Sequence, residues 1–464
     1  MQPSRVLSTA VLCGVFAFAL LSAVGSTNFD FRAFYCAGHA GLMRADPYRT
    51  EPLHTCERTQ TDSTFAAFFR DVALPAPQPG YDVAAFSLLA RLPFGPAAKI
   101  WSALLVLCSV GSVLLLRRVT QAPLAAVAVA LWLSSVTSIY LGEIVPFCLC
   151  AIAAAALFAQ NSRFTAAGIA AAAALVEPHI GIPVCLSVAL WLPKSRIALG
   201  ASVLLLAGVS IAMLGLAQNV QYVASVLPAH ALSEIGSDAQ LSLSAILHGL
   251  GMGDAAALKA GTVSFALITL LALAAAPMLA RRFGDPAFIV AVPSALAVTG
   301  GVFMHVTEIA AALPLALLLI RYARAERRTA VIALMLLAVP WWSLATPMLF
   351  GTATGVVLTG IALFYLIHQY VHVRPIGALA LAILAGAGVS AVLRWHDMNA
   401  IHTALHAAPA AILGAVYPEA SWKWFNDAYM STGSGAAWLL RVATWMGLCL
   451  VIWAALHKPK AVRI

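Results

Sequence analysis

Long apolar runs recur along the chain, and short groups of charged and polar residues separate them. The runs are continuous instead of alternating position by position, which favours membrane-spanning helices over strands. A helix needs about 20 apolar residues to cross a hydrocarbon core of about 30 Å. The pattern therefore predicts an all-α integral membrane protein with about 12–14 transmembrane helices. The predicted spans are residues 6–25, 97–116, 123–140, 144–160, 165–176, 180–192, 198–217, 257–280, 286–304, 309–320, 329–345, 351–370, 376–393 and 436–457.

The first run and one later pair need separate interpretation. The first run follows a short basic start, as a signal peptide would, but it exceeds the usual ~7–15 apolar residues, so we predict a retained span. The segments 165–176 and 180–192 are too short for two full crossings. Pro178 and Pro183 lie where a helix would be interrupted, so the pair predicts a broken hairpin with a partly buried turn.

Composition supports the membrane assignment. Hydrophobic residues make up 62% of the chain and charged residues 10%, and the mean hydropathy is +0.91. A soluble domain carries about 25% charged residues. The sequence contains no CxxC motif, no HExxH motif and no Cys/His cluster, so we predict no metal site.

The charges predict an orientation. If the spans alternate from a cytoplasmic start, most of the 27 Lys and Arg residues fall inside, whereas only Asp285 and Glu326 of the 18 acidic residues do. Basic residues are retained on the cytoplasmic side. We therefore predict a multi-pass inner (plasma) membrane protein with both termini in the cytoplasm. The pI of about 9.3 then reflects contact with anionic membrane lipids and not with nucleic acid.

The longer loops all fall outside in this topology, so we expect the chemistry on the periplasmic or exterior face. In the first of these loops, residues 64–73 and 83–92 have apolar residues at helical spacing, which predicts helices that lie in the outer interface; solvated connectors are the alternative. The outer segments are residues 26–96, 218–256 and 394–435, with short outer turns at 141–143 and 305–308.

Two cysteines, Cys36 and Cys56, share the first outer loop. An oxidising compartment would permit a disulfide between them. The alternative is a reduced Cys36 on an apolar helix face.

Asp30 stands about one helical turn beyond the first span. One interpretation is structural, with Asp30 as a helix-capping or interface carboxylate paired with Arg32. The other is functional, because a half-desolvated carboxylate is more basic than one in water, and a nearby cation tunes it back. A general base for a sugar hydroxyl has these properties.

The sequence around Asp30 resembles a known family. The stretch DFRAFYCA, which begins at Asp30, and ADPY at residues 45–48 follow the first span. They resemble the polytopic GT-C-type glycosyltransferases of the DUF2029 group, glycosyltransferase family 87, which are similar to polyprenol-phosphate-mannose-dependent mannosyltransferases. The similarity covers about residues 1–320 and includes ARLPFGPAAKIW (90–101), LGEIVPF (141–147), AAGIAAAAALVEPHIGIP (166–183), AQLSLSAILHGLG (239–251) and FMHVTEIAAALP (303–314).

The resemblance implies a fold and an activity. It implies a GT-C-like transmembrane catalytic module over residues 1–320, which includes the outer loop 26–96, and additional C-terminal transmembrane helices over residues 321–464, with the outer loop 394–435. The implied activity is an inverting hexosyltransferase of the cell envelope that makes a glycolipid or glycan. Such an enzyme moves mannose or another pentose or hexose from a polyprenyl-phosphate donor to a lipid or glycan hydroxyl at the outer leaflet.

The resemblance also implies site residues, with Asp30 as the general base. The donor phosphate leaves as a dianion, so cations must stabilise that charge. Cofactors and metal are not implied, because Asp30 and Arg32 lack the second carboxylate of a metal-binding acid pair. The candidates for donor phosphate or sugar binding are Arg32, Lys99, His179 and His305, and the supporting polar residues are Glu143, Glu177 and Glu308.

Several of these residues have structural alternatives. Lys99 can simply extend to the interface from the end of its span. His305 can cap a turn or bond Glu308, as a lone histidine near a span end often does. Polar groups at a broken helix, such as Glu177 and His179, need partners or water in any case.

Two residues depart from the family pattern. Glu177 stands where the family usually has Lys, and Glu143 where it usually has Gln. A site that loses a cation and gains carboxylates binds phosphate less well unless the new acids are paired. The departures imply a different donor, such as a sugar that carries an amine, or an altered activity.

The third outer loop combines Trp395, Trp422, Trp424 and Tyr429 with acidic residues, which suits a carbohydrate. An interfacial aromatic belt explains the tryptophans equally well, and we favour the belt.

Two other functions compete with transfer. A lipid-linked glycan flippase or secondary transporter places ionisable residues near the bilayer midplane and often has two related halves. Here the acids gather at the outer ends of the predicted spans, and no half-repeat appears. The second competitor is an inactive GT-C-like subunit, which the two departures at Glu143 and Glu177 leave open.

Overall fold

The computed structural model describes residues 3–24, 27–60, 70, 72–298, 300–338, 361, 364–370, 412, 414–431 and 435–457. The predicted interfacial helix at 64–73 lies mostly outside these ranges. The predicted span 376–393, much of the spans 329–345 and 351–370, and Trp395 of the third outer loop also lie outside them.

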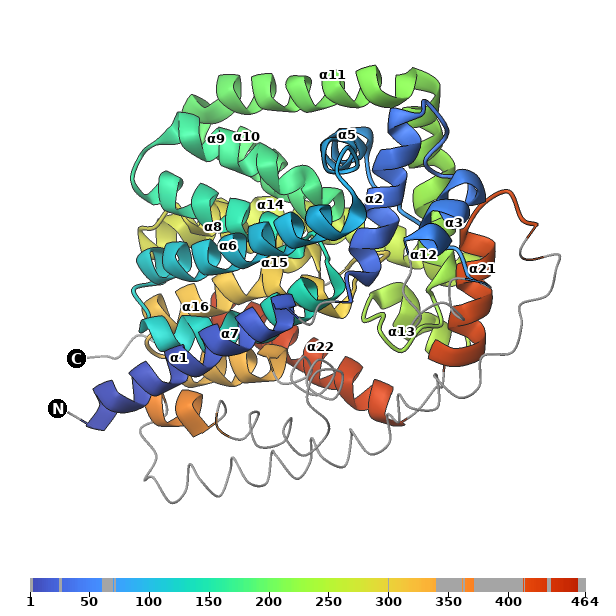
Figure 1. Cartoon of the computed structure of the whole chain (residues 1–464). Helices are drawn as coiled ribbons and strands as arrows, with labels where there is room; N and C mark the ends of the chain where they lie inside the picture. The colour runs from blue at the N-terminus through green and yellow to red at the C-terminus, as the bar shows by residue number, and fades with distance from the viewer. Residues whose placement is uncertain are drawn as a thin grey trace, which may run out of the picture.

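The described ranges fold as a bundle of helices, and they contain no β-strand apart from an isolated bridge between Gln240 and His305. Figure 1 shows the helices of the main bundle lying side by side, with α11 along one edge. These helices are α1 (Pro3–Val24), α6 (Phe94–Thr120), α7 (Leu124–Leu141), α8 (Val145–Gln160), α9 (Phe164–Ala173), α10 (Pro178–Trp191), α11 (Arg196–Gln221), α14 (Asp254–Phe283), α15 (Phe288–Ala297), α16 (Leu313–Tyr322) and α22 (Gly435–Leu456).

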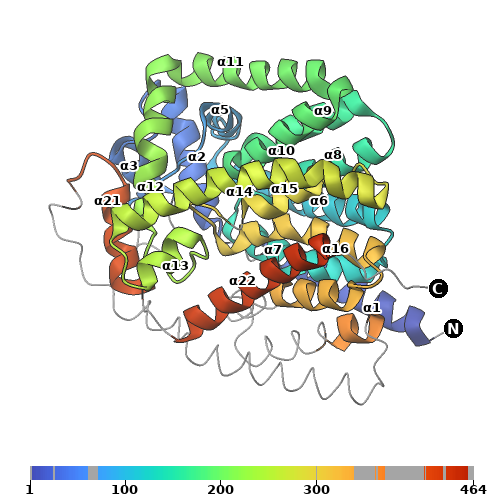
Figure 2. The same ribbon diagram turned by 180° about the vertical axis from the view of Figure 1, so that it is seen from behind.

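Shorter helices gather at one end of this bundle, away from the start of α1 and the end of α22 (Figures 1 and 2). Helix α5 (Gly80–Leu89) packs between α2 and α11. It confirms the helix that apolar spacing predicts at residues 83–92. The other short helices are α2 (Phe29–Leu42), α3 (Thr50–Thr59), α12 (Leu227–Ser233), α13 (Leu243–Gly249) and α21 (Glu419–Phe425).

Three described helical segments, Phe94–Thr120, Pro193–Ser233 and Asp254–Phe283, are long and apolar enough to cross a membrane. A fourth would be α7, whose two parts are bent by 45°. Large apolar side chains project outward from these segments, among them Leu204 at 73% exposure and Leu271 at 65%. An outward apolar surface of this extent suits lipid. The protein is therefore an all-α membrane protein, and the larger span count stays a prediction.

The predicted broken hairpin is present. Helix α9 continues into the 3₁₀ turn η1 (Ala174–Val176), and α10 begins directly after Glu177, whose extended backbone (φ −118°, ψ 90°) makes the break. Pro178 is the first residue of α10, where its missing N–H costs nothing. Gly181 then packs so closely on Ala174 that a Cβ there would lie 2.4 Å from the Ala174 carbonyl oxygen. This contact holds Glu177 at a tight turn.

The centre of the bundle lies at α15 and α16, whose side chains are buried on nearly all sides. A helix that is apolar all round belongs in such a position. Helix α15 ends at Ala297, so the predicted span 286–304 is shorter than expected. Beyond it, the Met304 carbonyl accepts the Leu241 N–H (3.0 Å).

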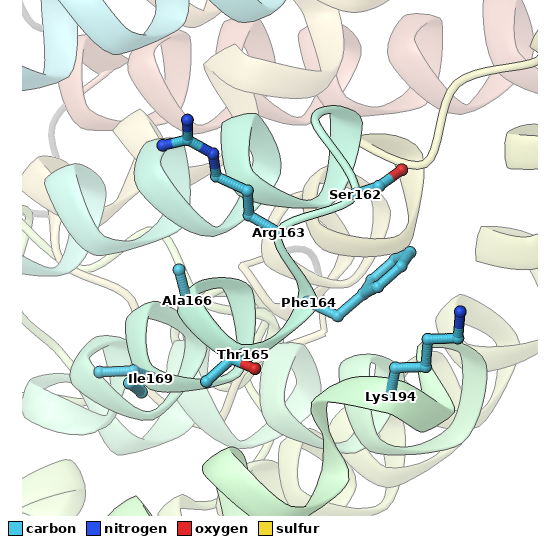
Figure 3. A pocket seen from close by; sticks show the side chains of 7 residues that line it. All are labelled: Ser162, Arg163, Phe164, Thr165, Ala166, Ile169 and Lys194. Atoms are coloured by element: carbon cyan, nitrogen blue, oxygen red, sulfur yellow. The ribbon is translucent and has the colours of Figure 1, made fainter.

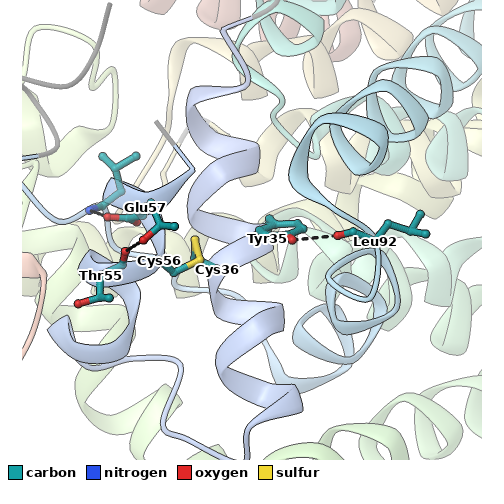
Figure 4. Close-up of a disulfide and its surroundings, with 8 residues drawn as sticks. Tyr35, Cys36, Thr55, Cys56, Glu57 and Leu92 are labelled. Carbon is teal, nitrogen blue, oxygen red and sulfur yellow. Dashed lines mark hydrogen bonds between the residues drawn. A yellow bond between two sulfur atoms is a disulfide. The ribbon is translucent and has the colours of Figure 1, made fainter. Parts of the chain in front are cut away.

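Helix α2 is fastened on two sides (Figure 4). A disulfide joins Cys36 to Cys56 of α3, at the pair that the sequence singles out. On the other side of α2, the Tyr35 hydroxyl donates to the Leu92 carbonyl (2.9 Å), in the turn between α5 and α6. These contacts hold α2 rigidly against the bundle.

The C-terminal part of the chain reaches the same end of the bundle. The Arg441 guanidinium of α22 donates to the carbonyls of Gln240 (3.1 Å) and Ser237 (2.9 Å). The Trp445 indole, also in α22, donates to the Leu241 carbonyl (3.0 Å). The segment after the predicted boundary at residue 320 thus supports the loop that precedes it, and the boundary itself stays a prediction.

Candidate functional site

Asp30 lies in the first turn of α2, beside the end of α7. The backbone N–H groups of Thr27 and Asn28 donate to the Tyr140 carbonyl (3.0 and 3.3 Å). Asn28 has a left-handed backbone (φ 47°), which asparagine tolerates better than most residues. Asp30 is half-buried. Within the described part of the chain, no group donates a hydrogen bond to its carboxylate.

Glu143 comes next to this helix because of Gly142, which ends α7 in a left-handed conformation (φ 86°). A Cβ at Gly142 would lie 2.6 Å from the Phe31 Cβ, so only glycine allows α2 to approach this closely. The Trp101 indole N–H donates to the Gly142 carbonyl (2.8 Å) and fixes the turn. Glu143 then accepts a hydrogen bond from the Ser138 hydroxyl (3.1 Å).

His305 is held by a carboxylate that the sequence did not single out. Its Nε2 lies 2.6 Å from Glu234 Oε2. The other Glu234 oxygen accepts from the Trp422 indole at 2.5 Å, and Oε2 also accepts from the Gln240 amide at 2.8 Å. Glu234 is buried, and all of its neighbours come from different elements. The only sequence signal for it is an acid inside the predicted outer segment 218–256.

Trp422 was predicted to belong to an aromatic belt or to a carbohydrate platform. Its indole N–H instead donates to Glu234, and its ring stacks on Phe425 with centroids 5.4 Å apart. This contact brings a residue of the C-terminal part into the support of His305. Hydropathy and motifs carry no information on such a pairing.

His179 lies at the start of α10, between two carboxylates. Its Nε2 is 3.0 Å from Glu308 Oε2, and its Nδ1 is 3.8 Å from Glu177 Oε2. Glu308 belongs to the 3₁₀ helix η4 (Val306–Ala312) and accepts the His305 N–H (3.0 Å). This hydrogen bond confirms that the turn at 305–308 links His305 and Glu308. The histidines thus lie on neighbouring parts of one polar cluster.

The charges of the cluster act on one another. Burial raises the pKa of Asp30 well above 3.8, Glu143 raises it further, and His305 lowers it. Burial favours neutral His305, but Glu234 outweighs that effect and raises the His305 pKa to about 10. Burial likewise opposes ionisation of Glu234, yet His305 lowers its pKa to about 2. His305 and Glu234 therefore form a charged pair at neutral pH, and Asp30 is a stronger base than a solvated aspartate.

Two predicted cations do not join the cluster. Arg32 is two residues from Asp30 on the same helix, and side chains at that spacing point to different sides. Its guanidinium lies over the Phe94 ring at 5.3 Å, and its charge acts on Glu57 of α3. Lys99 lies on the exposed side of α6. The alternative in which Arg32 pairs with Asp30 is therefore wrong, and Lys99 matches its structural alternative.

A further carboxylate lies near Glu177. Asp82 of α5 is 4% exposed, and its Oδ2 has no hydrogen-bond partner. The next residue back, Tyr81, donates to the Leu175 carbonyl (2.6 Å), which fixes α5 against the turn before Glu177. The charge of Glu177 acts on Asp82. Sequence reasoning did not select Asp82, because its helix looked like an interfacial element.

A shallow hollow of about 460 Å³ lies at the far end of the α9–α10 hairpin (Figure 3). Phe164 points toward Lys194 there, with the ammonium 5.8 Å from the ring centre. Arg163 and Ser162 also line it. It contains none of the predicted site residues.

The polar cluster combines three kinds of functional group. Asp30 offers a carboxylate that is free to accept a proton. His305 offers a cation that Glu234 keeps charged and oriented. His179, Glu177 and Glu308 offer a set of nitrogen and oxygen atoms beside them.

A comparison with protein families gives one relationship. The model of glycosyltransferase family 87 matches residues 81–304. The matched range contains Glu143, Glu177, His179 and Glu234 and ends one residue before His305. Comparisons with curated proteins and with solved structures gave no match.

Proposed function

We infer which polar groups transfer a sugar in this chain. The inference starts from the match of residues 81–304 to glycosyltransferase family 87. The donor is a polyprenyl-phosphate sugar, and the acceptor is a hydroxyl of a lipid or glycan. Asp30 is the general base. The observation that carries this assignment is the Asp30 carboxylate, which accepts no hydrogen bond from the described residues, whereas Glu143 and Glu234 near it both have hydrogen-bond partners.

The proton transfer follows from the environment of Asp30. A base acts best when its pKa approaches the working pH, and burial together with Glu143 raises the pKa of Asp30. The hydrogen bonds from Thr27 and Asn28 to Tyr140 fix the start of α2. Asp30 is therefore both more basic than usual and held in place, as a base for an acceptor hydroxyl must be.

The transfer is a single displacement at the anomeric carbon. The acceptor oxygen forms the new bond to that carbon while the bond to the phosphate oxygen breaks, so the configuration inverts. Asp30 takes the acceptor proton, and polyprenyl phosphate leaves with the electron pair of the broken bond. His305 stabilises the charge that develops on the phosphate, because Glu234 keeps this histidine protonated.

The membrane orientation is part of the proposal. Basic residues lie at the end of the bundle opposite Asp30, at the ends of α6 (Arg117, Arg118) and α14 (Arg281, Arg282). Basic residues are retained in the cytoplasm. The cluster would then face the periplasm or exterior at the outer leaflet, where a polyprenyl carrier reaches it from the lipid.

One assay tests the function. The purified full-length chain in lipid nanodiscs is given radiolabelled polyprenyl-phosphate mannose, and then other polyprenyl-phosphate sugars, together with a lipid extract that supplies acceptors. We expect a labelled product with the wild-type chain and about 10²–10⁴-fold slower formation of it with Asp30→Asn. The matched control is Asp427→Asn, at an exposed aspartate that pairs with Lys423, and it should transfer normally.

The results separate the competing functions. Movement of labelled donor across the bilayer without a new glycosidic bond would identify a flippase or transporter. Normal transfer by Asp30→Asn would remove Asp30 from the reaction.

A further inference from the structure

Glu177, His179 and Glu308 form a compact set of metal-ligand atoms. One nitrogen or oxygen from each residue lies within 4.8 Å of the other two. Glu308 is 3% exposed, while Glu177 and His179 are half-buried. The set therefore has a buried side and a more open side.

The backbone holds these three residues in place without any ligand. Glu177 occupies the tight turn between η1 and α10, where its carbonyl accepts the Gly181 N–H (2.7 Å). Glu308 is fixed by the His305 N–H (3.0 Å). Ligands that are positioned before binding lose little entropy when an ion arrives.

His179 Nε2 is a buried nitrogen that makes no hydrogen bond, although Glu308 Oε2 lies only 3.0 Å away. The two atoms therefore form a close ion pair without good hydrogen-bond geometry. Two donor atoms that share one cation lie at about this separation, since a Zn²⁺ ion keeps its nitrogen and oxygen ligands about 2.0–2.2 Å away.

The surroundings of the set contain more acids than bases. Glu234 has His305 as its partner, and Glu308 has His179. Among the described residues, Asp82 and Glu143 form no ion pair, and Glu177 has only the 3.8 Å contact with the same His179. The Asp82 Oδ2 is buried without a hydrogen bond. An added cation would reduce the repulsion between these carboxylates and a donor phosphate.

We propose that Glu177, His179 and Glu308 bind one divalent cation of the Mn²⁺ or Zn²⁺ type. One imidazole and two carboxylates are ligands that both ions accept, and three protein ligands leave positions open for other oxygens. A bound cation would differ from the sequence-based prediction that the protein has no metal site. A contact between this cation and the donor phosphate rests on the proposed function. Binding of the cation to the three residues does not.

The test measures metal binding without any sugar donor. The purified full-length chain is treated with a chelator, returned to chelator-free buffer and titrated with Mn²⁺, and the free ion is followed by electron paramagnetic resonance. Zn²⁺ is titrated in parallel by calorimetry. We expect one saturable site for at least one of the two ions.

Variants assign the site. Glu177→Gln and His179→Gln should each weaken binding by about 100-fold or more, because they remove a ligand and not an outer partner, whose loss costs about 10–100-fold. Asp427→Asn, at an exposed acid, should bind as the wild type does and so controls for surface carboxylates. An unchanged elution volume and melting temperature before metal is added would show that the variants fold.

Two results would overturn the proposal. One is the absence of a saturable site for both ions, which would leave His179 as a protonated partner of Glu308. The other is equal binding by wild type and by folded Glu177→Gln. Because no donor is present, neither result bears on sugar transfer, and a chain that binds metal but transfers no sugar would contradict only the proposed function.

Discussion

Two aspartates at opposite ends of the bundle differ in how many hydrogen bonds their carboxylate oxygens accept. At one end, Asp285 follows α14, and its Oδ2 accepts from the Gln160 amide (2.6 Å) and the Tyr322 hydroxyl (2.7 Å). Its Oδ1 accepts the Ala287 N–H (2.9 Å). At the other end, Asp30 accepts no hydrogen bond from the described residues.

The difference separates a structural acid from a reactive one. Asp285 joins the ends of α8, α14 and α16, because its partners Gln160 and Tyr322 end two of these helices. A carboxylate whose two oxygens both accept hydrogen bonds stabilises the fold and is less available for chemistry. The position of Asp30 is fixed by its place in α2 and not by hydrogen bonds to its carboxylate. A cluster with such a group is the better candidate for function.

The largest expected effect is on catalysis at Asp30. Asp30→Asn should reduce the transfer rate by about 10²–10⁴-fold, the usual contribution of a positioned general base. Its melting temperature should stay close to that of the wild type, because no hydrogen bond to this carboxylate is lost. A large drop in melting temperature would show that Asp30 is structural, as Asp285 is.

Asp285→Ala should have the opposite profile. The free energy of unfolding should fall by about 2–4 kcal/mol, because the half-buried Gln160 and Tyr322 and the Ala287 N–H would all lose this acceptor. Denaturant or thermal unfolding in detergent measures the change. The fraction that remains folded should transfer sugar at the wild-type rate, and a selective loss of activity would connect this end to the reaction.

Glu234→Gln tests whether His305 needs its partner. Transfer should fall by about tenfold, less than the 10²–10³-fold that follows loss of a whole stabilising donor. The pH profile distinguishes this role from a structural one. Burial favours neutral His305, and Glu234 opposes it by raising the pKa to about 10. Without Glu234 the alkaline limb of the profile should therefore move to lower pH; an unmoved limb would contradict the role of this pair.

The acid limb of the wild-type profile reports on Asp30. Its pKa lies well above 3.8, because of burial and then Glu143. The base must be ionised, so kcat/KM should fall as pH drops through that raised pKa, by at most about tenfold per pH unit. Glu143→Gln removes a negative charge and should move the limb to lower pH. A limb at the pKa of a solvated aspartate would argue against a half-buried base.

The smallest effect is expected at Tyr322. Tyr322→Phe removes one of the hydrogen bonds to Asp285 and should lower the free energy of unfolding by about 1 kcal/mol. Transfer should be unchanged. A loss as large as that of Asp285→Ala would mean that Tyr322 carries most of this network.

The comparison also shows which elements the sequence predicts well. Continuous apolar runs predicted α6 and α14 to within a few residues, because a long apolar helix has only one environment that suits it. The break at Glu177 was predicted from Pro178, since proline limits the backbone directly. Helices α12, α13 and α21 were not predicted. They have only seven residues each, and helices this short depend on tertiary contacts.

The residues of the candidate site also divide into those that the sequence predicted and those that it did not. Asp30, Glu143, Glu177, His179, His305 and Glu308 came from motifs next to predicted spans, and these residues lie in one cluster. Arg32 and Lys99 came from the same reasoning and lie elsewhere, because sequence proximity does not fix the side of a helix. Glu234 and Trp422 are 188 residues apart, and only the folded chain brings them together.

The sequence by itself determined the membrane environment, the long helices and the similarity to glycosyltransferase family 87 over residues 81–304, because apolar length and local motifs act over short stretches of chain. The tertiary structure decided which acids are paired and which are free. Pairing depends on where distant segments meet: Asp285 meets Gln160 and Tyr322, Glu234 meets His305, and Asp30 receives no donor from the described residues. The chemical role of a carboxylate is set by those partners and by burial, which no short stretch of sequence contains.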